Sequence, residues 1–358
     1  MRILYGVVGE GMGHAMRSRV VLDQLTKRHD VQVVVSGRAH DYLQSRAGQR
    51  LTVKKIWGYT LVYEDNEVRR WRTLLENARG ALAGWPENVR AYFDVAERFA
   101  PDVVISDFES WSYLFARRHR LPLISLDNMQ IINRCRHPPE IVEGLGADFK
   151  LTNAIVRTKV ADARHYFITT FFYPPVRKPN TTLHPPILRP EILAAAPGAG
   201  DHLLVYQTAT SASALPEVLA GCGRECRIYG LRRDLKEEVV EGRLRYRPFS
   251  EAGFVEDLRT ARGVIASAGF TLMGEAVYLR RPMLAVPLAG QVEQILNARY
   301  LEREGYGLAA ETMDAAHLDE FLGSLPEIER RLAGYRQDGN ADLLGALEAK
   351  LSEIAAAA

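Results

Sequence analysis

Cysteine is scarce in this chain, whose 358 residues include only Cys135, Cys222 and Cys226. An odd and sparse set of this kind excludes a disulfide framework. Cys222 and Cys226 are four residues apart and have no second pair to complete a zinc site. We therefore expect reduced thiols in a cytoplasmic protein.

Long apolar runs and a charge excess of one sign are also missing. No run reaches the roughly 20 apolar residues of a membrane-spanning helix, so any membrane contact would be peripheral. The apolar N-terminus leads directly into a glycine loop, which indicates a first buried strand rather than a signal peptide. The formal net charge of +2 gives no strong field for nucleic acid, and the nine histidines form no metal-ligand cluster.

The composition is that of a globular protein, with 47% hydrophobic and 25% charged residues, and the length suits two domains. Short apolar runs alternate with amphipathic stretches, which predicts βαβ units and parallel sheets. In the first half we expect the strands Arg2–Val8, Asp30–Ser36, Thr52–Ile56, Val103–Ser106, Leu123–Leu126 and, last, Tyr166–Phe171. In the second half we expect Leu203–Gln207, Cys226–Tyr229, Leu244–Pro248, Gly263–Ser267 and Met283–Val286.

Residues 174–190 are rich in proline and read as a linker between the halves. The predicted fold class is α/β, with two doubly wound Rossmann-like domains that face each other across a cleft. We place the first domain at residues 1–180 and the second at 181–330. Residues 331–358 form a tail, part of a long helical stretch expected over Ile328–Ala357. Ligands of such sheets bind at the carboxyl ends of the strands, where the strand order reverses.

A glycine loop, Gly9-x-Gly11-x-Gly13-His14, follows the first predicted strand and opens a helix. Such a loop lets a backbone or an anion approach the start of the helix closely. The loop lacks the final small residue of the Gly-x-Gly-x-x-Gly pattern of dinucleotide-binding proteins. The acidic residue that would bind the ribose after the second strand is also missing. His14 at this position could take a proton from a hydroxyl group near pH 7, although a capping or solvent-exposed histidine would occupy the same place.

Two carboxylates, Asp107 and Glu109, end the buried strand that starts at Val103. Asp107 is expected at the same sheet edge as His14, where it would fix the tautomer of the imidazole. Either acid could instead cap the next helix, and the Asp-x-Glu spacing leaves a metal site as a third interpretation.

The second half carries a strand, a tight glycine turn and a helix start at residues 264–271. Backbone N–H groups at such a turn suit a diphosphate. In the helix that follows, Glu275 could accept hydrogen bonds from ribose hydroxyls. Further along, glutamine and glutamate side chains at the start of the next helix could bind sugar hydroxyls. The donor-binding candidates of this half are Ser267, Gly269, Phe270, Thr271, Glu275, Gln291, Glu293 and Gln294.

The order of these residues resembles the nucleotide-sugar signature of GT-B glycosyltransferases. That group includes the glucuronosyl- and glucosyltransferases of small molecules and the peptidoglycan N-acetylglucosaminyltransferase. The resemblance rests on Gly269, Glu275, Glu293-Gln294 and Asn297-Ala298, with a departure at Glu293, where the family has Asp or Gln. The loop that contains Gly9, Gly11 and Gly13, with Glu109 nearby, resembles the acceptor side of the same families.

The resemblance implies an inverting, metal-independent transfer from a nucleotide-diphosphate sugar, with uridine as the expected base. It implies that His14 is the catalytic base and that Asp107 orients it. It also places Phe249 in the loop that binds the nucleobase and Ser211 against a phosphate, although Phe249 could equally be a core aromatic. The nucleotide sugar would be a substrate, and no cofactor or metal is expected. The tail after Ile328 would cross back to the first domain.

Three alternatives remain open at this stage: a UDP-sugar epimerase of the same fold, a non-catalytic nucleotide-sugar binding protein, and a dehydrogenase. The acceptor could be a small molecule, a lipid or a glycan. Arg69-Arg70-Trp71-Arg72 mixes cations with an aromatic residue, which suits an anionic membrane surface or acceptor. The same residues could be a solvated helix face.

Overall fold

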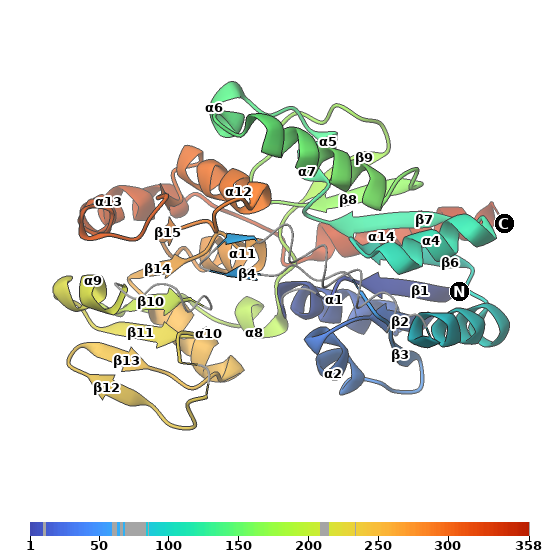
Figure 1. Cartoon of the computed structure of the whole chain (residues 1–358), viewed down its shortest axis with the longest axis horizontal. Helices are drawn as coiled ribbons and strands as arrows, with labels where there is room; N and C mark the ends of the chain where they lie inside the picture. The colour runs from blue at the N-terminus through green and yellow to red at the C-terminus, as the bar shows by residue number, and fades with distance from the viewer. Residues whose placement is uncertain are drawn as a thin grey trace. The chain divides into compact units, whose positions relative to one another are not determined.

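The computed structural model of the protein describes residues 1–9, 12–58, 63–64, 67–68, 84, 86–207, 215–232 and 234–357. The chain divides into two compact units (Figure 1). Unit 1 comprises Met1–Val62, Arg69–Ile187 and Asp338–Ala358, and unit 2 comprises Tyr63–Val68 and Leu188–Gln337. Unit 1 is thus discontinuous in sequence, and the chain passes to unit 2 within the proline-rich stretch.

Unit 1 is built on a seven-stranded sheet of order β3-β2-β1-β6-β7-β8-β9, in which every pair of neighbours is parallel. Its strands are β1 (Arg2–Val7), β2 (Asp30–Val35), β3 (Leu51–Lys55), β6 (Val103–Asp107), β7 (Leu123–Asp127), β8 (His165–Thr169) and β9 (Thr181–His184). Its helices are α1 (Met12–Leu25), α2 (Arg38–Gln44), the π-helical η1 (Asp94–Phe99), α4 (Ser110–His119), α5 (Ile131–Arg134), α6 (Pro139–Val142), α7 (Gly146–Lys159) and α14 (Ala341–Ala356).

Both faces of the unit 1 sheet are covered. Successive side chains of a strand point to opposite faces, so each strand contributes to two cores. On one face Ile3, Tyr5 and Val7 pack with α1, α2 and α14. On the other face Leu4 packs with α4 and the residues around Val95. Helix α14, drawn in red among the blue and green elements of unit 1, contributes Leu343, Leu347, Leu351 and Ile354 to the first of these cores (Figure 1).

Unit 2 has a second seven-stranded sheet, of order β12-β13-β11-β10-β14-β15-β16. All its neighbours are parallel except β12 and β13. Its strands are β10 (Leu203–Tyr206), β11 (Cys226–Tyr229), β12 (Val239–Glu241), β13 (Leu244–Tyr246), β14 (Gly263–Ala266), β15 (Met283–Ala285) and β16 (Gly307–Ala309). The helices are α8 (Pro190–Leu193), α9 (Leu215–Gly221), α10 (Glu251–Thr260), α11 (Phe270–Tyr278), α12 (Val292–Arg303) and α13 (Ala315–Leu332), and a small hairpin joins β4 (Tyr63–Glu64) to β5 (Glu67–Val68).

The predicted α/β class with two Rossmann-like sheets is confirmed, but one detail was wrong. Residues 174–190, read as a linker, contain β9, so Tyr166–Phe171 is not the last strand of the first half. Prolines flank β9 on both sides, which an edge strand tolerates. The helical tail expected over Ile328–Ala357 consists of the end of α13 and the whole of α14. Helix α13 ends at Leu332 and α14 begins at Ala341, after Gly339 and Asn340 adopt left-handed conformations with φ of 72° and 79°.

The order of the parallel strands reverses within each sheet. In unit 1 the reversal lies between β1 and β6, and in unit 2 it lies between β10 and β14. Loops at the carboxyl ends of these strand pairs are therefore the expected ligand positions of each unit. In the part of the chain that the structure describes, no helix is both long enough and apolar enough to cross a membrane.

Candidate active site

The carboxyl end of β6 and the first turn of α1 bring His14 and Asp107 together in unit 1. Strands β1 and β6 pair in register, with Val7 opposite Asp107, and the chain then turns into α1. The Nδ1 atom of His14 lies 3.0 Å from Oδ1 of Asp107. The His14 side chain is 18% exposed, whereas that of Asp107 is 1% exposed. The imidazole can therefore meet a ligand while the carboxylate behind it is sealed from water.

Arg17, one helical turn after His14, is a member of this cluster that the sequence did not reveal. Its Nε donates to Oδ2 of Asp107 at 3.1 Å, and its Nη2 donates to Oδ1 at 2.5 Å. The same Nη2 lies 2.7 Å from Nδ1 of His14, and Nη1 donates to Asn128 at 2.5 Å. The i,i+3 spacing of His14 and Arg17 places both on one helix face, which is the only signal the sequence offered.

The two contacts of the His14 Nδ1 atom correspond to different tautomers. If Nδ1 carries the proton, it donates to Asp107 and leaves Nε2 free to accept a proton. If Nδ1 is bare, it accepts from Arg17, and Nε2 then carries the proton. Only the first tautomer makes His14 a base, so the balance between Asp107 and Arg17 governs the chemistry of the imidazole.

Charge at the edge of this sheet is controlled by burial and by Arg17. Burial by itself raises the pKa of Asp107, but the Arg17 guanidinium and His14 outweigh it and hold that pKa well below its usual range. Burial raises the pKa of Asp127, at the end of the neighbouring strand β7, to about 6, against hydrogen bonds from Gln130 and Ser125 that lower it. The Arg17 charge lowers the pKa of Asp127 less than these hydrogen bonds do. Asp107 is therefore the permanently ionised carboxylate of the pair.

The other acceptor-side candidates have structural partners. Glu109 is the N-cap of α4, and its carboxylate accepts from the backbone N–H groups of Trp111 and Ser112 at 2.7 and 2.6 Å. Gly9 packs so tightly that a Cβ atom there would lie 2.2 Å from the backbone oxygen of Ser36. Gly13 lies in the first turn of α1, and Gly11 lies outside the described residues. In the described ranges no group of three His, Cys, Asp or Glu side chains is arranged to hold a metal ion.

In unit 2, the turn at residues 267–269 lies at the carboxyl end of β14, beside β10. Gly269 is the N-cap residue of α11 and has no side chain to cap it. Its φ of −70° suits any residue, and a Cβ atom there would meet nothing within 4 Å. Among the described residues, the space beside Gly269 is therefore open at the N-terminus of α11, where N–H groups and the helix dipole favour an anion. Ser267 and Thr271 flank this turn half-buried, and Phe270 packs into the core.

Glu275 lies in α11, and the structure gives it a partner that the sequence did not suggest. Its two carboxylate oxygens accept from Nε and Nη2 of Arg189 at 2.7 and 2.9 Å. Glu275 is only 2% exposed. The Nη1 atom of Arg189 also donates to Glu251 at 2.9 Å. The predicted ribose acceptor is thus held in place by an arginine from the start of unit 2.

The start of α12 is tied to the glycine turn. The side chain of Asn297 donates to the backbone oxygen of Ala268 at 3.2 Å. The side chain of Gln294 accepts from the backbone N–H of Leu288 at 2.9 Å, so it orders the loop before the helix. Gln291 is the N-cap residue of α12 and Glu293 lies in its first turn, both partly exposed.

Phe249 lies just after β13 and is 65% exposed, so it is not the core aromatic that the sequence left open. Ser250 then caps α10 by accepting from the backbone N–H of Gly253 at 3.2 Å. Ser211 and the Arg69–Arg72 stretch lie outside the described residues.

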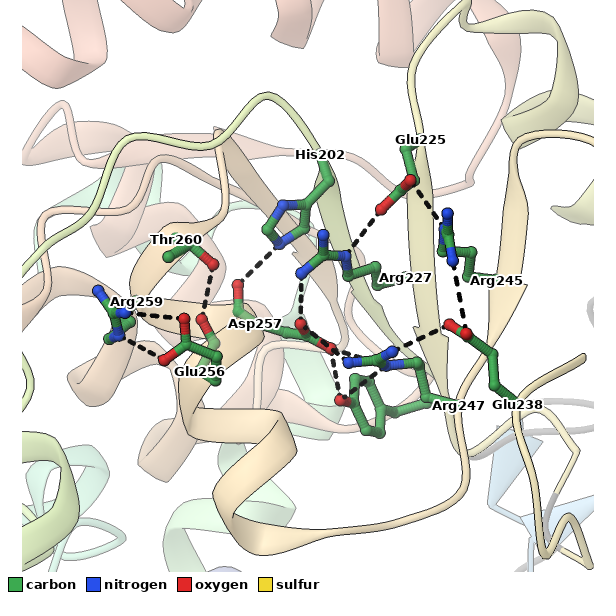
Figure 2. Close-up of polar contacts among 11 residues, drawn as sticks. His202, Glu225, Arg227, Glu238, Arg245, Arg247, Glu256, Asp257, Arg259 and Thr260 are labelled. Carbon is green, nitrogen blue, oxygen red and sulfur yellow. Dashed lines mark hydrogen bonds and ion pairs between the residues drawn. The ribbon is translucent and has the colours of Figure 1, made fainter. Parts of the chain in front are cut away.

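A closed ring of six alternating charges anchors the segment before Phe249 (Figure 2). Asp257 of α10 is fully buried and accepts from Arg227 at 2.5 Å and from Arg247 at 3.0 Å. The ring passes on from Arg247 through Glu238, Arg245 and Glu225, and returns to Arg227. Because Arg247 comes two residues before Phe249, the ring fixes where the exposed aromatic leaves the sheet.

Comparisons with known proteins identify the family of the chain. The sequence profile of glycosyl transferase family 1 matches residues 1–326. An uncharacterized glycosyltransferase of Methanosarcina mazei is 24% identical over 339 residues, which cover 86% of this chain and 85% of that protein. A Bacillus cereus UDP-N-acetylglucosamine–N-acetylmuramyl-(pentapeptide) pyrophosphoryl-undecaprenol N-acetylglucosamine transferase is 40% identical over 86 residues, or 23% of this chain and 24% of that protein.

Solved GT-B glycosyltransferases share the fold. Arabidopsis thaliana UGT89C1, complexed with UDP-L-rhamnose, superposes with a TM-score of 0.66 at 13% identity and covers 99% of this chain and 98% of its own. The calicheamicin glycosyltransferase CalG4 superposes with a TM-score of 0.61 at 16% identity and covers 98% of each chain. The resemblance drawn from the sequence is confirmed. The chain belongs to glycosyl transferase family 1, has the GT-B fold and is a glycosyltransferase.

Proposed function

We propose that this enzyme transfers a sugar from a UDP-sugar to an acceptor hydroxyl group with inversion at the anomeric carbon, and that it needs no metal. The observation that carries the proposal is the contact of 3.0 Å between His14 and the buried Asp107. The turn at Gly269 and the nearby Glu275 support donor binding by unit 2. The UDP-L-rhamnose complex of the Arabidopsis relative supports UDP as the nucleotide.

The proposed step moves one proton and exchanges one bond. Nε2 of His14 takes the proton of the acceptor hydroxyl while Nδ1–H donates to Asp107. The acceptor oxygen attacks the anomeric carbon from the face opposite the diphosphate. The bond from that carbon to the phosphate oxygen breaks, and UDP leaves with the electron pair. The carbon passes through an oxocarbenium-like state. The N-terminus of α11 stabilises the charge on the diphosphate, which is the role that a metal would otherwise have.

The acceptor is proposed as a small molecule, a lipid or a glycan that presents a hydroxyl group. The name of the Bacillus cereus relative includes a pyrophosphoryl-undecaprenol acceptor, which supports including lipid-linked sugars in an acceptor panel. No cofactor beyond the nucleotide-sugar substrate is proposed.

The test begins with thermal shift of the protein against UDP, TDP, GDP, ADP, NAD and UDP-sugars. A ligand at 100 times its dissociation constant should add about 2.7 kcal/mol of stability. With the donor known, UDP release is measured over the acceptor panel for wild type, His14→Ala and His40→Ala. His40 contacts Asp41 at 2.9 Å, so it is a matched control from another His–Asp pair of unit 1.

We expect His14→Ala to lower kcat by roughly 10²- to 10⁴-fold, the usual contribution of a general base, with UDP affinity unchanged. His40→Ala should behave as wild type. A His14→Ala variant with full activity would show that His14 is not the base. Stabilisation by NAD alone, or by no nucleotide, would reject UDP-sugar as the donor. Strong inhibition by a chelator would reject the metal-independent mechanism.

A further inference from the structure

Arg189 is buried at the start of unit 2 and joins two acidic residues that are distant in sequence. Its side chain is 4% exposed. Two of its nitrogens bind both oxygens of Glu275, and the third binds Glu251. A planar guanidinium that donates to a carboxylate through two parallel bonds fixes the direction of that carboxylate as well as its charge.

The two partners of Arg189 belong to the two helices that carry the donor-site candidates. Glu251 is the first residue of α10, directly after Phe249 and Ser250. Glu275 lies in α11, which begins after the open turn at Gly269. One side chain therefore ties together the segment with the exposed aromatic residue and the helix that follows the open turn.

Glu275 depends on Arg189 for both its direction and its charge. At 2% exposure, its side chain is packed on nearly all sides. Burial raises the pKa of Glu275, and the hydrogen bonds and charge of Arg189 oppose that rise without cancelling it. A carboxylate offers about four lone-pair sites, of which the two bonds from Arg189 occupy two. The remaining sites can accept from hydroxyl groups only in the orientation that Arg189 imposes.

We propose that Arg189 is a positioning residue for the nucleoside of the donor: it holds the Glu275 carboxylate toward the ribose hydroxyls and holds α10 beside it through Glu251. The proposal rests on the UDP-sugar donor of the preceding section. It adds a residue that sets the preference for a ribose with free hydroxyls. Arg189 itself touches no substrate in this assignment.

The experiment compares binding of UDP and of 2′,3′-dideoxy-UDP to wild type and to Arg189→Lys by calorimetry. Lysine keeps the positive charge but cannot make the two parallel bonds. Wild type should bind UDP at least about tenfold more tightly than the dideoxy nucleotide, because hydrogen bonds to a charged group would be lost. Arg189→Lys should bind UDP about tenfold more weakly and the dideoxy nucleotide as before, so that the preference nearly disappears.

Arg259→Lys is the matched control. Arg259 also binds both oxygens of a glutamate, Glu256, and it does so on α10, but the pair is exposed at 33% and 54% (Figure 2). This variant should bind both nucleotides as wild type does. If Arg189→Lys does not fold, Arg189→Gln takes its place, because it keeps Glu275 and a hydrogen-bond donor but cannot make the two parallel bonds. It should show the same loss of preference.

Each result decides the proposal. A wild-type preference that persists in the folded Arg189 variant overturns the positioning role. A wild type that binds UDP without any preference overturns it as well, and leaves the UDP-sugar donor standing. A wild type that binds no nucleoside diphosphate overturns both this inference and the proposed donor.

Discussion

Arg17 donates to both carboxylate oxygens of Asp107, at 3.1 and 2.5 Å. The same carboxylate contacts His14, so an arginine and a histidine share one acid that is 1% exposed. The arginine keeps the acid ionised, and the acid selects the tautomer of the histidine. The candidate catalytic group is thus a cluster of three side chains rather than the His–Asp pair that the sequence indicated.

Replacing Arg17 by glutamine should reduce turnover. The Asp107 carboxylate would lose its strongest partner and turn, so that it would no longer orient the imidazole of His14. We expect kcat to fall by about 10- to 100-fold, with donor affinity unchanged, as for other residues that orient a base. Loss of one partner of a buried ion pair should also cost about 3 kcal/mol of unfolding free energy. Steady-state kinetics and urea denaturation measure the two effects.

Arg19→Gln is the control for the Arg17 variant. Arg19 is on the same helix and 2% exposed, but it donates to Tyr42 at 3.0 Å. It should lose stability and keep kcat. An Arg17→Gln enzyme with wild-type kcat would contradict the role given to Arg17.

Asp127 should make the protein less stable as the pH rises. Its pKa is about 6 in the fold and about 3.9 in an unfolded chain. Below pH 4 the carboxyl is protonated in both states. Between pH 4 and 6 it ionises only in the unfolded chain, so unfolding becomes easier. Above pH 6 the full loss of unfolding free energy is reached, and it amounts to about 3 kcal/mol.

Asp127→Asn removes this cost, so it should raise the melting temperature at pH 7.5 and leave it nearly unchanged at pH 4. Asparagine can still accept from the backbone N–H of Gln130, as Asp127 does at 2.8 Å. Calorimetric scans of both proteins over this pH range test the sign. Equal melting temperatures at pH 7.5 would show that Asp127 is already ionised without cost.

Gly269→Ala should separate binding from stability. Its backbone φ suits alanine and its Cβ atom would meet open space, so folding stability should change by less than about 1 kcal/mol. The methyl group would cover the N-terminus of α11 and should weaken UDP binding about tenfold by blocking the N–H groups that hold the diphosphate. Gly9→Ala gives the opposite pattern, because its Cβ atom would collide with Ser36 and lower the melting temperature. Unchanged UDP affinity in Gly269→Ala would place the diphosphate elsewhere.

The stretch Arg69-Arg70-Trp71-Arg72 has two interpretations, a surface for an anionic membrane and a solvated helix face. Under the membrane interpretation, flotation with vesicles that contain phosphatidylglycerol should carry wild type upward at low salt. A variant with glutamine at positions 69, 70 and 72 should lose the electrostatic part of the membrane-binding free energy, about 1 kcal/mol for each arginine. Equal flotation of both proteins would assign the stretch to a solvated surface.

The sequence predicted the fold because its central strands are distinctive. Strands β1, β6, β10 and β14 are apolar runs that end in polar or glycine-rich turns, which is how buried parallel strands read. The strands β9, β12 and β16 were missed. They have three or four residues each and lie at or near the sheet edges, where pairing with a neighbour matters more than local propensity.

The candidate site was predicted where its residues are local in sequence. His14, Asp107 and Gly269 each end a strand or open a helix. Arg17 and Arg189 were missed because an arginine in a helix or a proline-rich stretch normally faces water. Their partners lie 90 and 86 residues away, and nothing in the pattern of either segment shows that the side chain turns inward.

The return of α14 to unit 1 orders the events of biosynthesis. A ribosome releases the strands of unit 1 before those of unit 2, yet Leu343, Leu347, Leu351 and Ile354 of the unit 1 core leave the exit tunnel after all of unit 2. Unit 2, complete by Gln337, can therefore close before unit 1 does. Until α14 docks, the nascent unit 1 exposes the apolar face that α14 later covers.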